Sequence, residues 1–218
     1  MNCCHCEGIE QQFDPATADR ELRRFRRKGA RSTTKMLIGD LRAAGVNGLS
    51  LLDIGGGIGA IHHELLDAGA TTAVHVDVSP AYIAAAESEA VRRGHADRVR
   101  FVHGDFVEVA TTLPDADVVT LDRVICCYPD MPLLVGRAAE KARRVFAAVY
   151  PRDVWWMRAG AALANRFLRL KRSAFRVYIH SPTAVGAELA RRGFERFDLR
   201  RTIAWEVVAW RATGRAQH

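Results

Sequence analysis

The chain has 218 residues, of which 49% are hydrophobic and 26% are charged. This length suffices for one ordinary domain with a full core, and the composition excludes intrinsic disorder, collagen and coiled coils. No stretch approaches the roughly 18 uncharged apolar residues of a membrane span, and the first residues lack the pattern of a secretory signal. We therefore expect a cytoplasmic protein.

The formal net charge is +7 at pH 7, and a positive surface concentrates anions around it. Much of the charge lies between residues 152 and 176, where seven bases stand against one acid, Asp153. One interpretation of this segment is that it binds an anionic partner. The other is that the many arginines only reflect the nucleotide composition of the gene. The seven bases are Arg152, Arg158, Arg166, Arg169, Lys171, Arg172 and Arg176.

From residue 49 onward, short apolar runs alternate with helical patterns. Pro80 suits the first turn of a helix and Gly94 suits its end. This alternation predicts βαβ units and a parallel sheet with helices on both faces. The predicted strands are 49–54, 72–77, 98–103, 116–121 and 144–150, and the predicted helices between them are 58–68, 80–94 and 131–141.

The C-terminal part departs from this alternation. Helical patterns over 154–171 and 182–192 precede two apolar runs, 194–200 and 205–210. The connection between the two runs is too short for a parallel crossover, which takes about a dozen residues. The predicted fold class is therefore α/β, a doubly wound, Rossmann-like and mainly parallel seven-stranded sheet with an antiparallel last strand and helices on both faces.

A glycine-rich loop, Gly55-Gly-Gly-Ile-Gly59, joins the first predicted strand to the first helix. Glycines there let the backbone turn sharply and approach a ligand at a helix N-terminus. Asp77, which ends the next strand, is placed to accept hydrogen bonds from both hydroxyls of a ribose. Gly55-x-Gly57-x-x-Ala60 fits a dinucleotide loop, Asp53-x-Gly55-x-Gly57-x-Gly59 fits a loop that binds S-adenosylmethionine, and a purely structural turn is a third interpretation.

Three observations favour S-adenosylmethionine. Asp53 would repel a pyrophosphate but can help to anchor a sulfonium or, through water, an ammonium. Gly104-Asp105-Phe106, after the third strand, offers a carboxylate to an adenine amine and a ring beside the base. The chain is short of a dehydrogenase substrate domain and has no Tyr-x-x-x-Lys motif, which disfavours hydride transfer.

From about Leu49 to Trp210 the chain resembles the class I S-adenosylmethionine-dependent methyltransferases. The resemblance rests on the glycine loop, on His75-Val-Asp-Val-Ser79, on 104–106, on Leu121-Asp122 and on the antiparallel last strand. It implies S-adenosylmethionine as the cofactor. The residues that it assigns to this cofactor are Asp53, Gly55, Gly57, Gly59, Asp77, Val78, Asp105, Phe106 and Asp122.

Within that set the resemblance implies separate roles. The three loop glycines would line the methionine part, Asp77 would hold the ribose, and Asp105 and Phe106 would hold the adenine. Asp122 would lie near the methionine amino group or the substrate. The implied division is an N-terminal tail and helical cap, 1–46, and a methyltransferase domain, 47–218, with an inserted lid helix at about 153–172.

The expected activity is methyl transfer to a small molecule, anionic or aromatic, at an oxygen. Nucleic acid is not expected as a substrate, because the Asn-Pro-Pro-Tyr motif of many nucleic-acid and protein amide methylases is missing. Tyr128 and Asp122 are the catalytic candidates, although Tyr128 is as well explained by packing at a strand end. The alternative function is a non-catalytic regulatory protein that binds S-adenosylmethionine or a metal and engages nucleic acid or membrane.

The C-terminal part, from Arg172 to His180 and from Phe194 to Trp210, is weakly similar to magnesium-protoporphyrin O-methyltransferases. Two positions differ from that family. Its Ile-His-Tyr-Pro segment is replaced by one containing Cys126 and Cys127, and its N-terminal Tyr-Phe pair is replaced by Gln12-Phe13. The similarity favours a bulky anionic substrate without naming a porphyrin.

Two further features leave alternatives open. The helical pattern at 154–171 is compatible with a lid in which Trp155 and Trp156 wall the substrate, with a solvated helix, or with a helix that contacts a membrane surface. The N-terminal Cys3-Cys4-His5-Cys6 is compatible with a disordered tail or with a tail that folds over Cys126 and Cys127 to capture a thiophilic metal. We assign no metal ligand, and the oligomeric state stays open.

Overall fold

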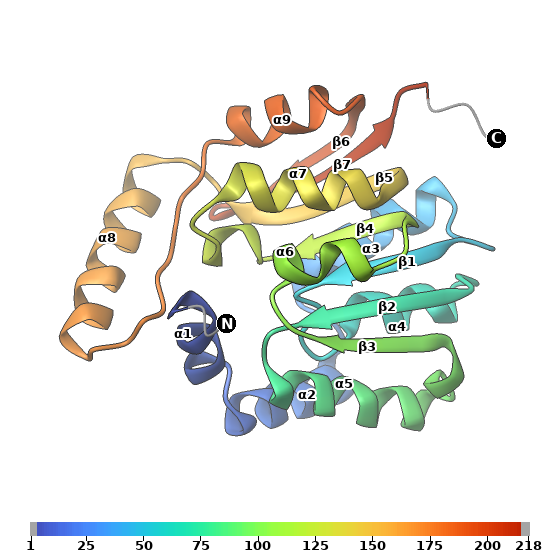
Figure 1. The fold of residues 1–218 in the computed structure, drawn as a ribbon, viewed down its shortest axis with the longest axis horizontal. Helices are drawn as coiled ribbons and strands as arrows, with labels where there is room; N and C mark the ends of the chain where they lie inside the picture. Colours follow the sequence, from blue (N-terminus) through green and yellow to red (C-terminus); the bar gives the residue numbers. More distant parts are fainter. Residues whose placement is uncertain (1–3, 215–218) are drawn as a thin grey trace.

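The computed structural model describes residues 4–214, with side chains from Gly8 onward. Its centre is a seven-stranded sheet in the order β3-β2-β1-β4-β5-β7-β6 (Figure 1). The strands are β1 (Ser50–Ile54), β2 (Thr72–Asp77), β3 (Val99–His103), β4 (Ala116–Asp122), β5 (Ala142–Pro151), β6 (Phe194–Arg201) and β7 (Trp205–Ala212).

The first five strands are parallel, and β7 pairs antiparallel with both β5 and β6. The predicted fold class is confirmed, including the antiparallel last strand. The last strand, β7, inserts between β5 and β6 in the sheet. β7 is therefore an inner strand, and β6 forms the edge. β5 extends beyond its predicted ends because it pairs with β4 on one side and with β7 on the other.

Helices cover both faces of the sheet (Figure 1). On one face, α6 (Phe106–Val109), α7 (Met131–Lys141) and α9 (Pro182–Ala190) pack over a core that includes Phe146 and Trp210. On the other face, α3 (Ser32–Ala44), α4 (Ala60–Asp67) and α5 (Pro80–Arg93) pack over a core that includes Val149 and Val207. The alternation of short apolar runs with helical patterns in the sequence predicted this two-faced burial.

The second of two N-terminal helices completes the second face. α1 (Cys4–Gln12) and α2 (Pro15–Lys28) precede α3, and Asp14 caps α2 by accepting a hydrogen bond from the Thr17 amide at 2.8 Å. Leu22 and Phe25 of α2 are buried in the same core as α3 and α5. α2 is also tied to α5 by a hydrogen bond from Arg26 Nε to the buried carboxylate of Glu89 at 2.8 Å. The N-terminal segment is therefore packed onto the sheet domain.

α8 (Trp155–Leu170) follows β5 and stands at the side of the molecule (Figure 1). It contains no buried residue. Its position is set by Asn165, whose side chain exchanges two 2.8 Å hydrogen bonds with the backbone of Val177. None of the helices within residues 4–214 is long and apolar enough to cross a bilayer.

Candidate active site

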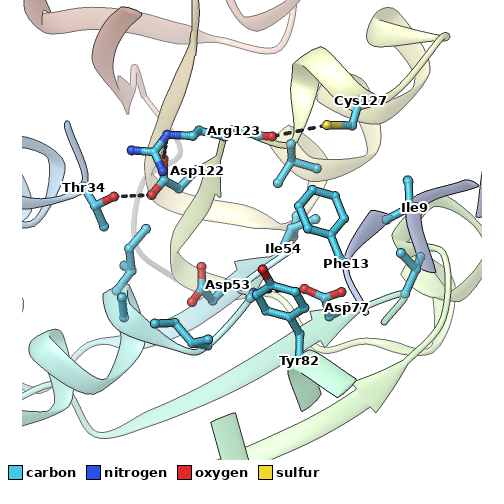
Figure 2. Close-up of a pocket in the computed structure, with 18 of the residues that line it drawn as sticks. Ile9, Phe13, Thr34, Asp53, Ile54, Asp77, Tyr82, Asp122, Arg123 and Cys127 are labelled. Carbon is cyan, nitrogen blue, oxygen red and sulfur yellow. Dashed lines mark hydrogen bonds and ion pairs between the residues drawn. The ribbon is translucent and has the colours of Figure 1, made fainter. Parts of the chain in front are cut away.

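A cavity of about 750 Å³ opens at the carboxyl ends of β1, β2 and β4 (Figure 2). Open α/β sheets bind their ligands at the carboxyl ends of the strands. The site lies at the switch point of the topology, where the connections on the two sides of the first strand run in opposite directions. The volume lies in the range of small-molecule and cofactor sites. Among the residues with predicted roles, the cavity is lined by Asp53, Gly55, Gly57, Asp77, Val78, Asp105, Phe106, Asp122 and Tyr128. Gly59 is adjacent to this set and caps α4.

The glycine loop needs glycine for two different reasons. Gly55, Gly57 and Gly59 have φ values of +59°, +56° and +79°, which L side chains rarely adopt. Gly56 has an ordinary φ, but a Cβ there would lie 2.5 Å from His75 Nδ1 and 2.9 Å from Asp53 Oδ2. The loop therefore lies directly against buried side chains beneath it.

Asp77 holds the loop and faces the cavity. Its Oδ2 accepts a hydrogen bond from the Gly57 amide at 2.9 Å, and its Oδ1 accepts one from the Ser79 amide at 2.8 Å. Burial raises the pKa of Asp77 to about 6, because desolvation outweighs these hydrogen bonds. Val78 follows in the cavity wall, and its carbonyl accepts a hydrogen bond from His103 at 3.0 Å.

Asp105 and Tyr128 meet beside the Asp77 end of the cavity. Asp105 caps α6 by accepting a hydrogen bond from the Val107 amide at 2.9 Å. The Tyr128 hydroxyl donates to Asp105 Oδ2 at 3.2 Å, so two residues that are 23 positions apart share one hydrogen bond. Phe106 is buried and contributes both to the cavity wall and to the core under α7.

Asp122, at the end of β4, stands at a different wall of the cavity (Figure 2). Thr34 of α3 donates a hydrogen bond to its Oδ2 at 2.5 Å. Its Oδ1 is shielded from solvent and accepts no hydrogen bond within the described chain, and the nearest cation is Arg123 Nε at 3.8 Å. Burial raises the pKa of Asp122. Arg123 is itself held by Thr33 Oγ1 at 2.6 Å, and its guanidinium lies 5.3 Å from the ring of Trp205.

Asp53 lies under the glycine loop and is 1% exposed. Thr120 donates a hydrogen bond to one of its oxygens at 2.7 Å, and His62 lies 3.0 Å from the other. Asp53 thus contacts the cavity while both of its oxygens face partners within the chain. Burial raises the pKa of this carboxyl.

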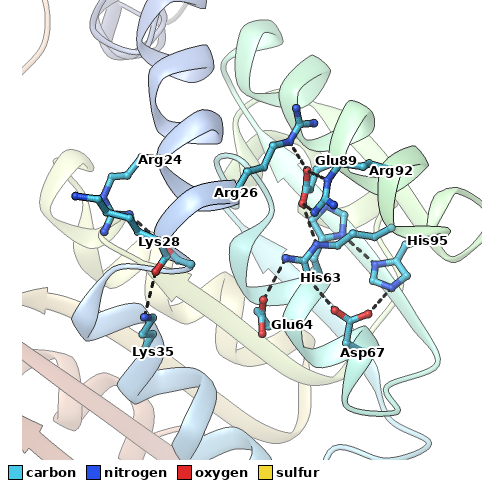
Figure 3. Close-up of polar contacts among 12 residues, drawn as sticks. Arg24, Arg26, Lys28, Lys35, His63, Glu64, Asp67, Glu89, Arg92 and His95 are labelled. Carbon is cyan, nitrogen blue, oxygen red and sulfur yellow. Dashed lines mark hydrogen bonds and ion pairs between the residues drawn. The ribbon is translucent and has the colours of Figure 1, made fainter.

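A cluster of buried histidines surrounds Asp53, and the sequence did not predict it. His62 and His75 are fully buried, with ring centroids 5.1 Å apart, and His63 is stacked near His95. From His63 a chain of contacts passes through His95 to Asp67 at the surface (Figure 3). Burial lowers the pKa of His62 and of His75 to about 3, so both rings are neutral at pH 7. Neither ring nitrogen of His75 has a hydrogen-bond partner in the described chain.

Cys126 and Cys127 both line the cavity, with their sulfur atoms 3.8 Å apart. Each thiol points to the carbonyl of Arg123, at 3.3 and 3.7 Å. Their mutual hydrogen bond raises the pKa of Cys126 and lowers the pKa of Cys127. The hypothesis that Cys3, Cys4 and Cys6 join them concerns side chains outside the described part of the chain.

The outer walls come from segments in which no site residue was predicted. Phe13 lies between α1 and α2, with its ring edge-on to Tyr82 at 5.6 Å and to Phe175 at 6.0 Å. Its backbone carbonyl accepts a hydrogen bond from Ser79 Oγ at 2.7 Å. The signals for this wall in the sequence were the helical cap implied for 1–46 and the place of Gln12-Phe13 opposite the Tyr-Phe pair of the magnesium-protoporphyrin O-methyltransferases. The walls beyond Phe13 are Ile9, Arg24, Phe25, Arg31, Phe175, Val177 and Trp205.

Of the three interpretations of this segment, the one in which Trp155 and Trp156 wall the substrate does not fit the cavity of this structure. Neither residue lines the cavity, and Trp155 is 80% exposed. The bonds between Asn165 and Val177 turn the opposite face of α8 toward the molecule, which leaves both indoles outside. The segment that follows α8, with Phe175 and Val177, occupies the wall instead.

The model of the O-methyltransferase domain family matches residues 4–134, more than half of the chain. The chain belongs to this family. It is an S-adenosylmethionine-dependent methyltransferase of class I, as the resemblance implied, and S-adenosylmethionine is its cofactor. The family assignment favours an enzyme over the regulatory alternative. None of the curated proteins compared with this methyltransferase matches it.

Solved structures share the fold of this methyltransferase at low sequence identity. Magnesium protoporphyrin IX methyltransferase from Synechocystis PCC 6803, with S-adenosylhomocysteine bound, is 18% identical with a TM-score of 0.67 over 83% of this chain and 82% of that one. An O-methyltransferase family protein from Burkholderia thailandensis is 16% identical with a TM-score of 0.71 over 94% and 63%. A putative sarcosine dimethylglycine methyltransferase from Galdieria sulphuraria is 14% identical with a TM-score of 0.66 over 83% and 85%.

Proposed function

We propose that this methyltransferase transfers a methyl group to an ionisable oxygen of a small aromatic acceptor. The observation that carries the proposal is Asp122, a carboxylate with 16% of its side chain exposed at a cavity wall apart from Asp77, whose Oδ1 accepts no hydrogen bond within the described residues. Desolvation raises the pKa of this carboxyl, which makes its carboxylate better suited to remove a proton from a hydroxyl.

The residues at the Asp77 end fit S-adenosylmethionine. Gly55 and Gly57 present backbone without Cβ atoms to the cavity, and Asp77 lines the cavity beside them with its Oδ2 bonded to the Gly57 amide and its Oδ1 bonded to the Ser79 amide. We assign the ribose to Asp77 and Val78, the adenine to Asp105 and Phe106, and the methionine part to Gly55, Gly57 and Gly59. The cofactor supplies a methyl group that its sulfonium has already activated.

Asp53 acts in this proposal from beneath the loop. Its hydrogen bonds to Thr120 and His62 hold it under Gly56, and its negative charge favours a cation above the loop. It would therefore stabilise the bound sulfonium electrostatically without forming a direct hydrogen bond.

In this proposal Tyr128 contacts the cofactor-binding residues, whereas Asp122 acts on the acceptor. Its hydroxyl donates to Asp105, so it would position that carboxylate for the exocyclic amine of the adenine. We therefore propose Tyr128 as a positioning residue for the cofactor and Asp122 as the base. An aromatic acceptor would be held over Asp122 by the rings of Phe13 and Phe175. The guanidinium of Arg123 would hold its anionic substituent.

The test is a methyl-transfer assay with hydroxylated aromatic acids, the matching neutral phenols and the same acids without a hydroxyl. We expect transfer to the hydroxylated acids, and we expect Asp122→Asn to lower kcat by about a hundredfold or more while S-adenosylhomocysteine binds as before. Asp130→Asn, an acid outside the cavity lining, is the control for the charge change. Methylation that survives intact in Asp122→Asn would remove the proposed base, and transfer to none of the panel would remove the acceptor class.

A further inference from the structure

α8 carries most of the exposed large hydrophobic side chains of the described chain. Five of the eight exposed large hydrophobic side chains within residues 8–214 lie on this one helix. At about 100° per residue they fall within an arc of roughly 120°, which forms a continuous stripe. Contiguous apolar surface of this kind marks an interaction site rather than ordinary surface. The stripe consists of Trp155, Trp156, Leu163, Phe167 and Leu170.

The opposite face of α8 packs against the rest of the protein. Met157, Ala161, Ala164 and Leu168 are half-buried, and they flank Asn165, which is bonded to Val177. The stripe is therefore the side of the helix for which the fold provides no cover. The turn between β6 and β7 adds Ile203, which is 81% exposed and whose carbonyl bonds Arg152 near the start of the helix.

Positive charge lies beside the stripe. Arg166, Arg169 and Arg172 are exposed and have no acidic partner within residues 8–214. Lys171 lies over the ring of Phe167, with Nζ 4.6 Å from the centroid. The one acid of this segment, Asp153, is already paired with Arg158 through two hydrogen bonds of 2.5 and 2.7 Å. The stripe therefore faces its partner with excess positive charge.

We propose that α8 docks the protein on an anionic lipid bilayer. The helix lies in the plane of the interface, with the stripe among the acyl chains and the arginines against the headgroups. A helix with Trp, Leu and Phe on one side and unpaired arginines at the edge has the composition of interfacial helices. A second copy of the chain fits less well, because a symmetric contact would bring two strongly basic segments together.

Docking would also bring the cavity to the membrane surface. Asn165 of α8 bonds both the amide and the carbonyl of Val177, and Val177 and Phe175 line the cavity. The helix that would contact the bilayer is thus hydrogen-bonded to the segment that forms this part of the cavity wall. The docking itself does not depend on which acceptor the enzyme methylates.

The test is cosedimentation with vesicles of phosphatidylcholine alone and of phosphatidylcholine mixed with phosphatidylglycerol. We expect at least about tenfold stronger partition onto the anionic vesicles, decreasing as salt is added. Quenching of tryptophan fluorescence by brominated acyl chains should accompany binding, because Trp155 and Trp156 enter the bilayer. Binding to neither vesicle, or equal binding to both, overturns the proposal.

Two matched pairs of variants assign the effect to α8. Leu163→Asp with Phe167→Asp should abolish partition, whereas Val91→Asp, at an exposed valine of α5, should not. Arg166→Glu with Arg169→Glu should lower partition about tenfold or more, whereas Arg143→Glu with Arg144→Glu, at the far end of β5, makes the same charge change without this loss. All substituted side chains are exposed, so the fold is expected to persist, and melting temperatures check it.

Other partners give distinct results. If ultracentrifugation shows a dimer that the Leu163→Asp and Phe167→Asp variant dissociates, and vesicles do not bind, the stripe covers a second copy. If soluble polyglutamate competes with the anionic vesicles and the aspartate variant binds as well as wild type, the partner is an acidic polypeptide. Either result contradicts the bilayer proposal.

Discussion

Asp77 supports the glycine loop and also lines the end of the cavity that we assign to the cofactor. Both functions need the ionised carboxylate, because the protonated acid loses acceptor capacity. Burial raises the pKa of this group to about 6, so it is charged above pH 6 and neutral below it. Cofactor affinity should therefore depend on pH near neutrality, which an exposed aspartate would not cause.

We expect Asp77→Asn to weaken S-adenosylhomocysteine binding by roughly tenfold to a hundredfold, because a charged hydrogen bond contributes about 1.5–3 kcal/mol. The wild-type affinity should also fall as the pH drops below 6, and the variant should lack this dependence. Isothermal titration calorimetry at several pH values measures both effects. Asp97→Asn, at an exposed acid, is the control, and an unchanged affinity in Asp77→Asn would contradict the ribose assignment.

Gly56 illustrates a glycine that is required by packing rather than by φ. We expect Gly56→Ala to lower the free energy of unfolding by about 1–3 kcal/mol, because the new methyl group would overlap the buried His75 and Asp53. Gly39→Ala is the matched control, because Gly39 is exposed within α3 and a Cβ there meets nothing within 4 Å. That change should raise stability by up to about 1 kcal/mol. Urea unfolding of both variants measures the difference, and equal effects of the same sign would show that the contact is absent.

At the scale of elements, Glu89 of α5 fastens the cap helix α2 to the domain (Figure 3). Burial by itself would raise the pKa of Glu89, but hydrogen bonds from Arg92, Arg26 and Arg93 lower it to about 2. α2 in turn carries Arg24 and Phe25 to the cavity wall. The shape of the cavity thus depends on an ion cluster outside it.

Glu89→Gln should lower the free energy of unfolding by about 1.5–3 kcal/mol, because the buried side chain of residue 89 loses its charge-assisted hydrogen bonds from Arg26, Arg92 and Arg93. Hydrogen exchange should rise over α2 more than over α7, which Glu89 does not contact. Glu87→Gln changes the same charge at an exposed position of α5 and should have little effect. Unchanged exchange over α2 in Glu89→Gln would show that the core contacts of Leu22 and Phe25 alone hold the helix.

At the scale of the whole molecule, the buried histidines make stability depend on pH. His62 and His75 have pKa values of about 3 and His63 of about 2, against about 6.5 in the unfolded chain, so the unfolded state binds more protons below pH 6.5. Their contribution to stability is full above pH 6.5 and is lost progressively as the pH falls from 6.5 toward the folded-state pKa values of about 2–3. Asp77 has the opposite sign, because its pKa is raised on folding, and it offsets part of the loss below pH 6.

We expect the free energy of unfolding to fall by about 2–3 kcal/mol between pH 7.5 and pH 5.5, from roughly 1.4 kcal/mol per buried histidine less the opposing carboxylates. His75→Asn should reduce this fall in the free energy of unfolding by the roughly 1.4 kcal/mol that one buried histidine contributes. His103→Asn should not, because His103 is 54% exposed. Urea unfolding at each pH is the measurement, and stability that is constant or rises on acidification would contradict the prediction.

The order of strands and helices, the glycine loop and the carboxyl-end positions of Asp77, Asp105 and Asp122 were predictable from the sequence. Each depends on short-range properties, namely apolar periodicity, glycine at positive φ and the placement of a residue at the end of a strand. The fold class followed, because parallel strands with helical crossovers allow few arrangements.

Only the tertiary structure decided the partners of these residues. Thr34 meets Asp122 across 88 positions, and Phe13 meets Ser79 across 66. The histidine cluster under Gly56 and the outward face of Trp155 likewise depend on which surfaces the folded chain brings together. Periodicity shows that a side chain is buried or exposed but does not name what lies opposite it, because that depends on contacts between distant segments.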